Sequence, residues 1–245
     1  MCNSVNIGKR IIELSSCHST NDYALDLIAK GEAQHGDVVY TINQTNGRGQ
    51  KGSVWVAPSG LNLTFSIVLT PFFLRPAYQF ELTVFISIAI INYLKSKNIV
   101  AKIKWPNDIY VGEKKLGGIL IENKIKGSKL SFSIVGIGIN VNQVGFGDLN
   151  AISLKAILKE TFSVYEELFT TFSFMNEVYN ALRKGEDLRK EYLSHLIGVD
   201  KEILFDDGEQ FMSKVVEVDD FGALVLNKNG LLKKYGVKEV KFLNL

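Results

Sequence analysis

The chain has 245 residues, which is long enough for one large domain or for one domain with a small second one. Hydrophobic residues make up 46% and charged residues 22%, as in ordinary soluble globular proteins, so extensive disorder is excluded. A net charge of +2 is too small to indicate general affinity for nucleic acid, and two cysteines are too few for a disulfide scaffold, so we expect a reducing, cytoplasmic environment.

The first two thirds of the chain contain several predicted strands and a long apolar helix. Residues 1–6 lack the basic region and apolar core of a secretory signal. Ser19 or Thr20 is placed to cap a short helix. Apolar residues repeat at three- and four-residue steps from 82 to 94 and predict a second helix, and the stretch 80–94 is judged too short and too polar for a membrane span. Strands are predicted over residues 5–14, 38–42, 61–69, 101–105, 109–111, 118–122 and 130–137, with a tight turn at Glu113-Lys114.

The end of the chain follows a different pattern. Helical spacing predicts another long helix from Tyr165 to Leu182. After Leu196, short apolar runs alternate with turn sequences such as Asp206-Asp207-Gly208. Five short strands at 202–205, 211–218, 223–226, 231–235 and 240–242 predict a small β-barrel or sandwich. We therefore expect two domains, residues 1–196 and 197–245.

Residues 47–55, Gly-Arg-Gly-Gln-Lys-Gly-Ser-Val-Trp, carry the strongest functional signal. Glycine lets a backbone approach a ligand, consecutive N–H groups can bind an anion, and Arg48 and Lys51 add positive charge. The segment indicates either a site for a phosphorylated small molecule or a basic surface turn. A Walker A loop is absent. The glycines fit the spacing of a dinucleotide fingerprint, but the β-prone residues and the proline that follow do not open a helix.

Two further clusters lie between the predicted strands of the middle region. Pro106 ends a strand and presents Asn107 and Asp108, an amide and a carboxylate suited to a nucleotide or to Mg²⁺. Lys115 precedes the pair Gly117-Gly118, where it is placed to meet an anion. Ordinary turns account for either cluster taken alone.

The last cluster is Gly136-Ile137-Gly138-Ile139-Asn140. Gly136 and Gly138 share one face of a strand and leave it bare for a flat ligand, unless the glycines serve close packing of a helix. Asn140 stands at the end of this strand. The three histidines are widely scattered, and no Cys/His cluster has the spacing of zinc ligands, so neither a nucleophilic dyad nor a zinc centre is predicted.

Five motifs in this order resemble those of biotin protein ligases. The resemblance runs from about Ile11 to the end of the chain. It implies an α/β (α+β) catalytic domain, with a mixed β-sheet packed by helices, followed by a small SH3-like β-barrel. The motifs are Ser19-Thr20-Asn21, Gln44 ahead of Gly47-Arg48-Gly49, Lys104 to Asp108, Lys115 to Glu122, and Gly136 to Asn140.

The resemblance implies an ATP-dependent ligase that works in two steps. The carboxylate of biotin attacks the α-phosphate of ATP and gives biotinyl-5′-AMP and pyrophosphate. A lysine amine of a biotin carboxyl carrier domain, such as that of acetyl-CoA carboxylase, then attacks the mixed anhydride and releases AMP. Biotin and ATP are substrates, Mg²⁺ is the implied metal, and no covalent intermediate with the enzyme is needed.

The resemblance also assigns roles by position in this sequence. Lys115 and Arg48 are the catalytic candidates, because Lys115 matches the lysine that contacts the reacting carboxylate and phosphate. Asp108 is the candidate near the metal. The candidates for biotin binding are Ser19, Thr20, Gln44, Gly47, Arg48, Lys115, Gly117, Gly118 and Gly136. The candidates for nucleotide binding are Gly49, Gln50, Lys51, Trp55, Asn107 and Asn140.

The chain departs from the family pattern in two places. Some members carry Arg-Arg-Gly-Arg where this chain has Gln50-Lys51-Gly52-Ser53, so two cations are missing and we expect weaker retention of the adenylate. Repressor-type members have a helix-turn-helix domain before the catalytic domain. Only about ten residues precede the resemblance here, so we expect no binding to DNA. We expect no membrane partner, and an exposed sheet edge would allow a homodimer.

Two other functions stay open. One is a lipoate or octanoate ligase or transferase of related fold, although Ser19, Thr20 and Gln44 favour a ligand with a polar head over a plain acyl chain. The other is a non-catalytic regulator that binds biotin or a nucleotide, against which the presence of both Lys115 and Arg48 argues.

Overall fold

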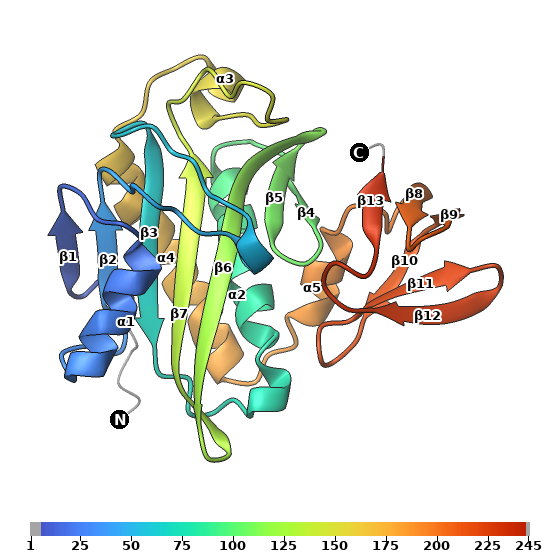
Figure 1. The fold of residues 1–245 in the computed structure, drawn as a ribbon, viewed down its shortest axis with the longest axis horizontal. Coiled ribbons are helices and arrows are strands. Elements are labelled where there is room, and N and C mark those ends of the chain that lie inside the picture. Colours follow the sequence, from blue (N-terminus) through green and yellow to red (C-terminus); the bar gives the residue numbers. More distant parts are fainter. Residues whose placement is uncertain (1–5, 244–245) are drawn as a thin grey trace.

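A seven-stranded sheet forms the larger part of the molecule (Figure 1). The structure is a computed structural model. It describes residues 6–243, and for Lys51 it describes the backbone alone. The strand order is β1-β2-β3-β7-β6-β5-β4. β1 and β2 run parallel and the other neighbours run antiparallel, so the mixed sheet is confirmed. The strands are β1 (Ile11–Leu14), β2 (Val38–Thr41), β3 (Asn62–Leu69), β4 (Lys102–Lys104), β5 (Asp108–Val111), β6 (Lys114–Lys126) and β7 (Lys129–Asn140).

Helices cover both faces of this sheet. Strand alternation divides the apolar residues, so that Val38 and Ile67 join the large core while Val39 and Val68 join a smaller cluster on the other face. The large core holds α2 (Glu81–Ser96) and α4 (Val164–Arg183), which pack against each other, and the smaller cluster holds α1 (Thr20–Lys30). Two short helices, α3 (Leu154–Leu158) and α5 (Arg189–Ser194), and two 3₁₀ turns, η1 (Gln50–Gly52) and η2 (Pro76–Tyr78), complete this part.

Helix α2 and the turn before it together pass the length and composition test for a membrane span. They cover Pro76–Ser96, 21 residues of which the most apolar window has a mean hydropathy of 1.4. The expectation that this stretch is too short and too polar was therefore wrong. In that window 61% of the residues are buried inside the protein, and the helix packs against α4 and the sheet, which is the placement of a core helix.

Several element boundaries differ from the predicted ones. Ser19 caps α1 by accepting a hydrogen bond from the backbone N–H of Asp22, as predicted. β1 begins at Ile11 rather than at Val5, which lies outside the described residues. The tight turn falls on Gly112-Glu113 instead of Glu113-Lys114, because Gly112 adopts the left-handed conformation (φ 58°) that such a turn needs.

The C-terminal residues form two three-stranded antiparallel sheets, β13-β8-β9 and β10-β11-β12. The predicted run 211–218 is divided at Lys214 into two strands, so there are six described strands rather than five. The aromatic ring of Phe205 packs against Phe211 and Phe242 in the core of the first sheet. The strands are β8 (Ile203–Asp206), β9 (Gln210–Ser213), β10 (Val215–Val218), β11 (Leu224–Lys228), β12 (Leu231–Tyr235) and β13 (Lys241–Leu243).

Specific contacts attach these small sheets to the large one. The guanidinium of Arg189 donates to the carboxylate of Glu81 (2.6 Å) and to the backbone carbonyls of Asp219 (2.8 Å) and Asp220 (2.9 Å). The indole N–H of Trp105 donates to the carbonyl of Gly222 (3.1 Å). The loop between β10 and β11 is therefore fixed to the segment that links β4 to β5.

The pH dependence of stability tests one buried group of the core. His35 Nδ1 accepts a hydrogen bond from the backbone N–H of Thr70 (2.8 Å), which requires a neutral ring. Burial is the main cause that lowers the pKa of His35, and the charge of Arg183 adds to it. The charge of Asp37 has a smaller, opposite effect on this pKa. In the unfolded chain the ring binds a proton below about pH 6.5. The free energy of unfolding should therefore fall as the pH is lowered through 6.5 toward the lower folded pKa.

Urea denaturation at pH 7.5 and pH 5.5 measures this dependence. The His35→Asn variant keeps an acceptor for Thr70 but has no titrating ring, so its free energy of unfolding should change less between the two pH values. Equal changes in the two proteins would contradict the role given to His35.

Candidate active site

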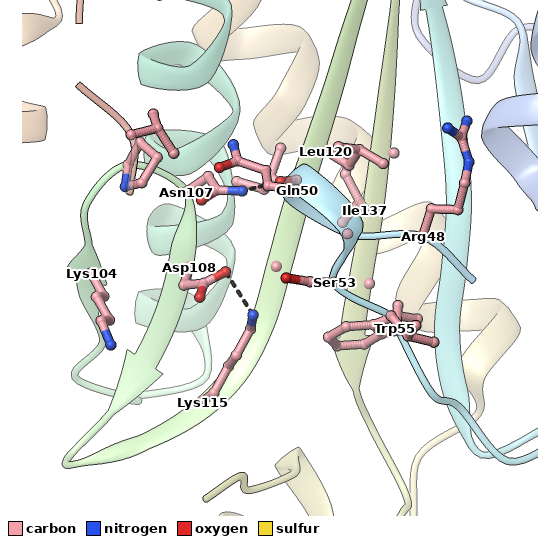
Figure 2. Close-up of a pocket in the computed structure, with 18 of the residues that line it drawn as sticks. Arg48, Gln50, Ser53, Trp55, Lys104, Asn107, Asp108, Lys115, Leu120 and Ile137 are labelled. Atoms are coloured by element: carbon pink, nitrogen blue, oxygen red, sulfur yellow. Dashed lines mark hydrogen bonds and ion pairs between the residues drawn. The ribbon is translucent and has the colours of Figure 1, made fainter. Parts of the chain in front are cut away.

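A cavity of about 650 Å³ lies over the middle of the large sheet (Figure 2). Its floor comes from β3, β7, β6, β5 and the end of β4, and its rim from the start of α1, from residues 44–55 and from residues 237–243 near the C-terminus. Segments far apart in the sequence thus meet around one space.

A row of register partners forms the floor of the cavity. Thr64 pairs with Gly138, Gly138 with Gly118, Gly118 with Asp108, and Asp108 with Lys104. All five line the cavity. Because the two central positions are glycine, the strands contribute no side chain of their own there, and the floor carries charge at its β4–β5 end.

The bare face predicted for Gly136 and Gly138 is present but is covered by side chains of the protein itself. A Cβ on Gly138 would lie 2.4 Å from the ring of Trp55, and one on Gly136 would lie 2.3 Å from Oδ1 of Asn21. The indole of Trp55 therefore lies directly on the strand, and its Nε1 is buried with no hydrogen-bond partner in the described residues. A buried donor without a partner inside a cavity is a natural contact for a polar ligand atom.

Lys115 reaches the cavity through an irregularity in β6. Ile109 pairs with Gly117 and Tyr110 with Lys115, so Leu116 is left as an extra residue between them. Leu116 is fully buried in the core, and Lys115 lies on the same side as Gly118, three residues on. Its Nζ forms an ion pair with Oδ1 of Asp108 at 2.7 Å (Figure 2).

Arg48 is held by two carboxylates. Its Nη2 lies 2.6 Å from Asp22 Oδ1 and 2.8 Å from Glu122 Oε2, and its Nε is buried without a partner in the described residues. Asn21 donates to the same oxygen of Glu122 at 2.7 Å. The arginine is thus placed over the cavity at a site that an anionic group of a ligand could share.

The start of α1 forms a polar network at the other end of the floor. Gln44 Oε1 accepts from the backbone N–H of Thr20 (2.9 Å), and Ser66 Oγ lies 2.7 Å from Thr20 Oγ1 and 2.6 Å from Asn21 Oδ1. Thr20 and Asn21 are buried. Sequence reasoning did not single out Ser66; the signal was the polar series Asn62, Thr64 and Ser66 on one face of β3.

Four of the predicted site residues are not found among the lining residues. Gly47 lets the backbone at the start of the loop pass close to the backbone of Trp55 at its end, since a Cβ on Gly47 would lie 2.3 Å from the carbonyl oxygen of Trp55. Gly117 faces away from Gly118, and a Cβ there would lie 2.7 Å from the carbonyl oxygen of Gly138, so only Gly118 belongs to the floor. Asn140 donates to the carbonyl of Ile152 (3.1 Å) and holds the chain beyond β7. The side chain of Lys51 lies outside the described residues.

The remaining predicted residues do line the cavity. They are Ser19, Thr20, Gln44, Arg48, Gly49, Gln50, Trp55, Asn107, Asp108, Lys115, Gly118 and Gly136. Asn107 is nonetheless engaged, because its amide nitrogen donates to the backbone carbonyl of Ile119. Within the described residues no three His, Cys, Asp or Glu side chains form a metal-binding group, so Asp108 could hold Mg²⁺ only together with oxygen atoms of a ligand.

Comparison with known proteins assigns the chain to a family. The model of the biotin/lipoate A/B protein ligase family matches residues 14–140. The bifunctional ligase/repressor BirA of Escherichia coli is 29% identical over 241 residues, which cover 93% of this chain and 72% of that protein. BirA of Bacillus subtilis is 35% identical over 139 residues, which cover 56% of this chain and 42% of that protein, so the chain matches less than half of that relative.

A solved structure shares the whole fold. The biotin protein ligase from Aquifex aeolicus, in complex with biotin and ATP, superimposes with a TM-score of 0.79 and 24% identity over 96% of this chain and 98% of that chain. The coverage includes the C-terminal sheets.

The close contact between Gly138 and Trp55 can be tested by Gly138→Ala. The added methyl group should displace the indole, shift the tryptophan fluorescence and destabilise the protein by roughly 1–3 kcal/mol. Gly145→Ala is the matched control, since a Cβ there meets no atom within 4 Å. In a Trp55→Ala background the cost of Gly138→Ala should largely disappear, and an undiminished cost would show that the indole is not what the methyl group meets.

Proposed function

This chain belongs to the biotin/lipoate A/B protein ligase family, and we propose that it activates biotin with ATP and transfers the biotinyl group to a lysine of a biotin carboxyl carrier domain. The proposal rests above all on one cavity to which all five motifs contribute lining residues. It is supported by relatives named as biotin–protein ligases in Arabidopsis thaliana and Homo sapiens. A cytoplasmic location and a requirement for Mg²⁺ belong to the same proposal.

The polar network at the start of α1 is the proposed site for the head of biotin. The hydroxyl groups of Ser19 and Thr20 and the amide of Gln44 supply donors and acceptors close to Gly136, against which the amide of Asn21 packs. A ureido ring is flat and has both N–H and C=O groups, so it needs this combination of partners. The tail of biotin would then extend along the floor toward Lys115.

The proposed chemistry needs position and charge rather than an enzyme nucleophile. An oxygen of the biotin carboxylate attacks the α-phosphorus of ATP, the bond from that phosphorus to the bridging oxygen breaks, and pyrophosphate leaves with the electron pair. Lys115, from the middle of the floor, stabilises negative charge on the carboxylate and the α-phosphate. Arg48 exchanges part of its pairing with Asp22 and Glu122 for the ligand. Holding both substrates in line lowers the barrier further.

The second step uses the same site. The lysine amine of the carrier attacks the carbonyl carbon of the mixed anhydride, and an amide bond forms. AMP leaves with the electrons of the broken C–O bond, and the amine nitrogen releases a proton to solvent. Asp108 is the proposed protein contact of Mg²⁺, which phosphates hold for the most part and which neutralises their charge.

Incubation of the protein with ATP, a carrier domain and one acid at a time tests the proposal. Biotinylated carrier is the expected product. Lipoylated or octanoylated carrier would assign the chain to the other branch of its family, and tight binding without product would make it a regulator.

Replacement of Lys115 by alanine tests the catalytic role. The Lys115→Ala variant should raise the barrier to adenylate formation by roughly 2–4 kcal/mol, the cost of one preorganised donor. Lys114→Ala removes a neighbouring exposed lysine of β6 and should leave the rate unchanged. The measurement is biotin-dependent release of pyrophosphate, and a near-normal rate for Lys115→Ala would remove the lysine from the mechanism.

Gln50 and Ser53 stand where some family members carry arginine in the loop of residues 47–55, and this difference can be tested. Gln50 and Ser53 line the cavity, and neither carries charge. Gln50→Arg restores a cation beside the phosphate of the adenylate, so biotinyl-AMP should leave that variant more slowly than the unaltered protein. Rapid gel filtration of preformed adenylate measures the release, with Gln50→Met as an uncharged control. Equal rates in all three proteins would show that this position does not affect retention.

A further inference from the structure

We propose that Lys104 binds the β- and γ-phosphates of ATP and stabilises pyrophosphate as it leaves. This inference rests on the proposed function and adds to it a residue from the cavity wall nearest the C-terminal sheets. Lys104 ends β4 and lines the cavity, but no step described so far uses it.

Lys104 differs from nearby lysines because it lacks a carboxylate partner. Lys102 pairs with Asp200 (3.0 Å) and Lys115 with Asp108 (2.7 Å). Over the described part of the chain, Lys104 forms neither an ion pair nor a side-chain hydrogen bond.

Two aromatic rings flank the ammonium group instead. Its Nζ lies 5.6 Å from the ring centroid of Tyr110 and 5.6 Å from that of Phe242, a residue of β13. Burial lowers the pKa of Lys104, and the charge of Lys115 acts in the same direction, while Asp108 opposes them. Ring faces compensate a half-buried cation only in part. An anion in the cavity would supply the missing countercharge.

The position of Lys104 in the sheet indicates which anion this is. Lys104 of β4 is the register partner of Asp108 of β5. The carboxylate of Asp108 forms an ion pair with Lys115 of β6. Lys104 therefore lies on the far side of Asp108 from Lys115, beyond the proposed α-phosphate site (Figure 2). Neighbouring strands are about 4.8 Å apart, so a chain of phosphates that starts beside Lys115 can reach Lys104 with its β- and γ-phosphates. The polar network for biotin lies at the opposite end of the same floor.

This geometry suits the leaving group of the first step. In an in-line displacement the attacking and leaving oxygens lie on opposite sides of the α-phosphorus. Biotin approaches from the side of Thr20 and Gly136, so the bridging oxygen and the β-phosphate point toward β5 and β4. When the bond to the bridging oxygen breaks, Lys104 neutralises the charge that pyrophosphate gains, and no proton has to move.

The test compares Lys104→Met with Lys102→Met, which removes the same charge from the same strand at a position outside the cavity lining. Lys104→Met should raise the KM for ATP and weaken inhibition by pyrophosphate by about ten- to hundredfold, the worth of one charged hydrogen bond. The affinity for biotin should not change. Lys104→Arg should recover most of the loss, and Lys102→Met should behave like the unaltered protein.

Direct titration with inorganic pyrophosphate separates this inference from the proposed function. If the unaltered protein makes no biotinyl-AMP, the proposed function fails, and the titration still decides whether Lys104 binds a polyphosphate. Equal pyrophosphate affinity in the unaltered protein and in Lys104→Met would overturn the inference. If Lys104→Met does not fold, as judged by lost biotin binding and a lower Tm, Lys104→Gln takes its place in both measurements.

Discussion

The cavity depends on glycine at paired positions of two central strands. Gly118 of β6 and Gly138 of β7 are register partners. A Cβ on Gly138 would lie 2.4 Å from the ring of Trp55, and one on Gly118 would lie 3.3 Å from Asp108 Oδ1 and Lys115 Nζ. The contact of Trp55 with Gly138 then ties the loop of residues 44–55 to the same point. The paired glycines therefore let the side chains of Trp55 and Lys115 lie on the floor of the cavity, and the first of these contacts anchors the loop.

Charge is distributed along this floor in a definite order. Arg48 with its two carboxylates lies toward α1, Lys115 with Asp108 lies in the middle, and Lys104 lies at the edge. Each inner cation has an acidic partner in the protein, which lowers the cost of burying it before a ligand binds. Such pairing also means that a ligand anion has to compete with a carboxylate, so binding and rearrangement of these side chains are coupled.

Local patterns predicted much of this arrangement, and long-range features escaped them. The cap at Ser19, the apolar helices and the shared face of Gly136 and Gly138 follow from residue type and spacing, and they were found. Local patterns could not predict which face of the sheet Lys115 and Gly117 lie on. The extra residue Leu116 reverses the alternation of side chains along β6. Likewise, the contact of Lys104 with Phe242 joins residues far apart in the sequence, and no local signal announces it.

The attachment of the C-terminal sheets limits how this chain can be recombined with its relatives. The carbonyl of Gly222 accepts a hydrogen bond from the indole N–H of Trp105, and a Cβ at Gly222 would lie 2.4 Å from the ring of Phe80. The loop between β10 and β11 is therefore closely packed against the part of the chain that forms the large sheet. Residues 237–243 also form part of the cavity wall. A chimaera that exchanges the C-terminal sheets must therefore carry over Phe80, Trp105 and Arg189 with them, or its cavity will have a displaced wall.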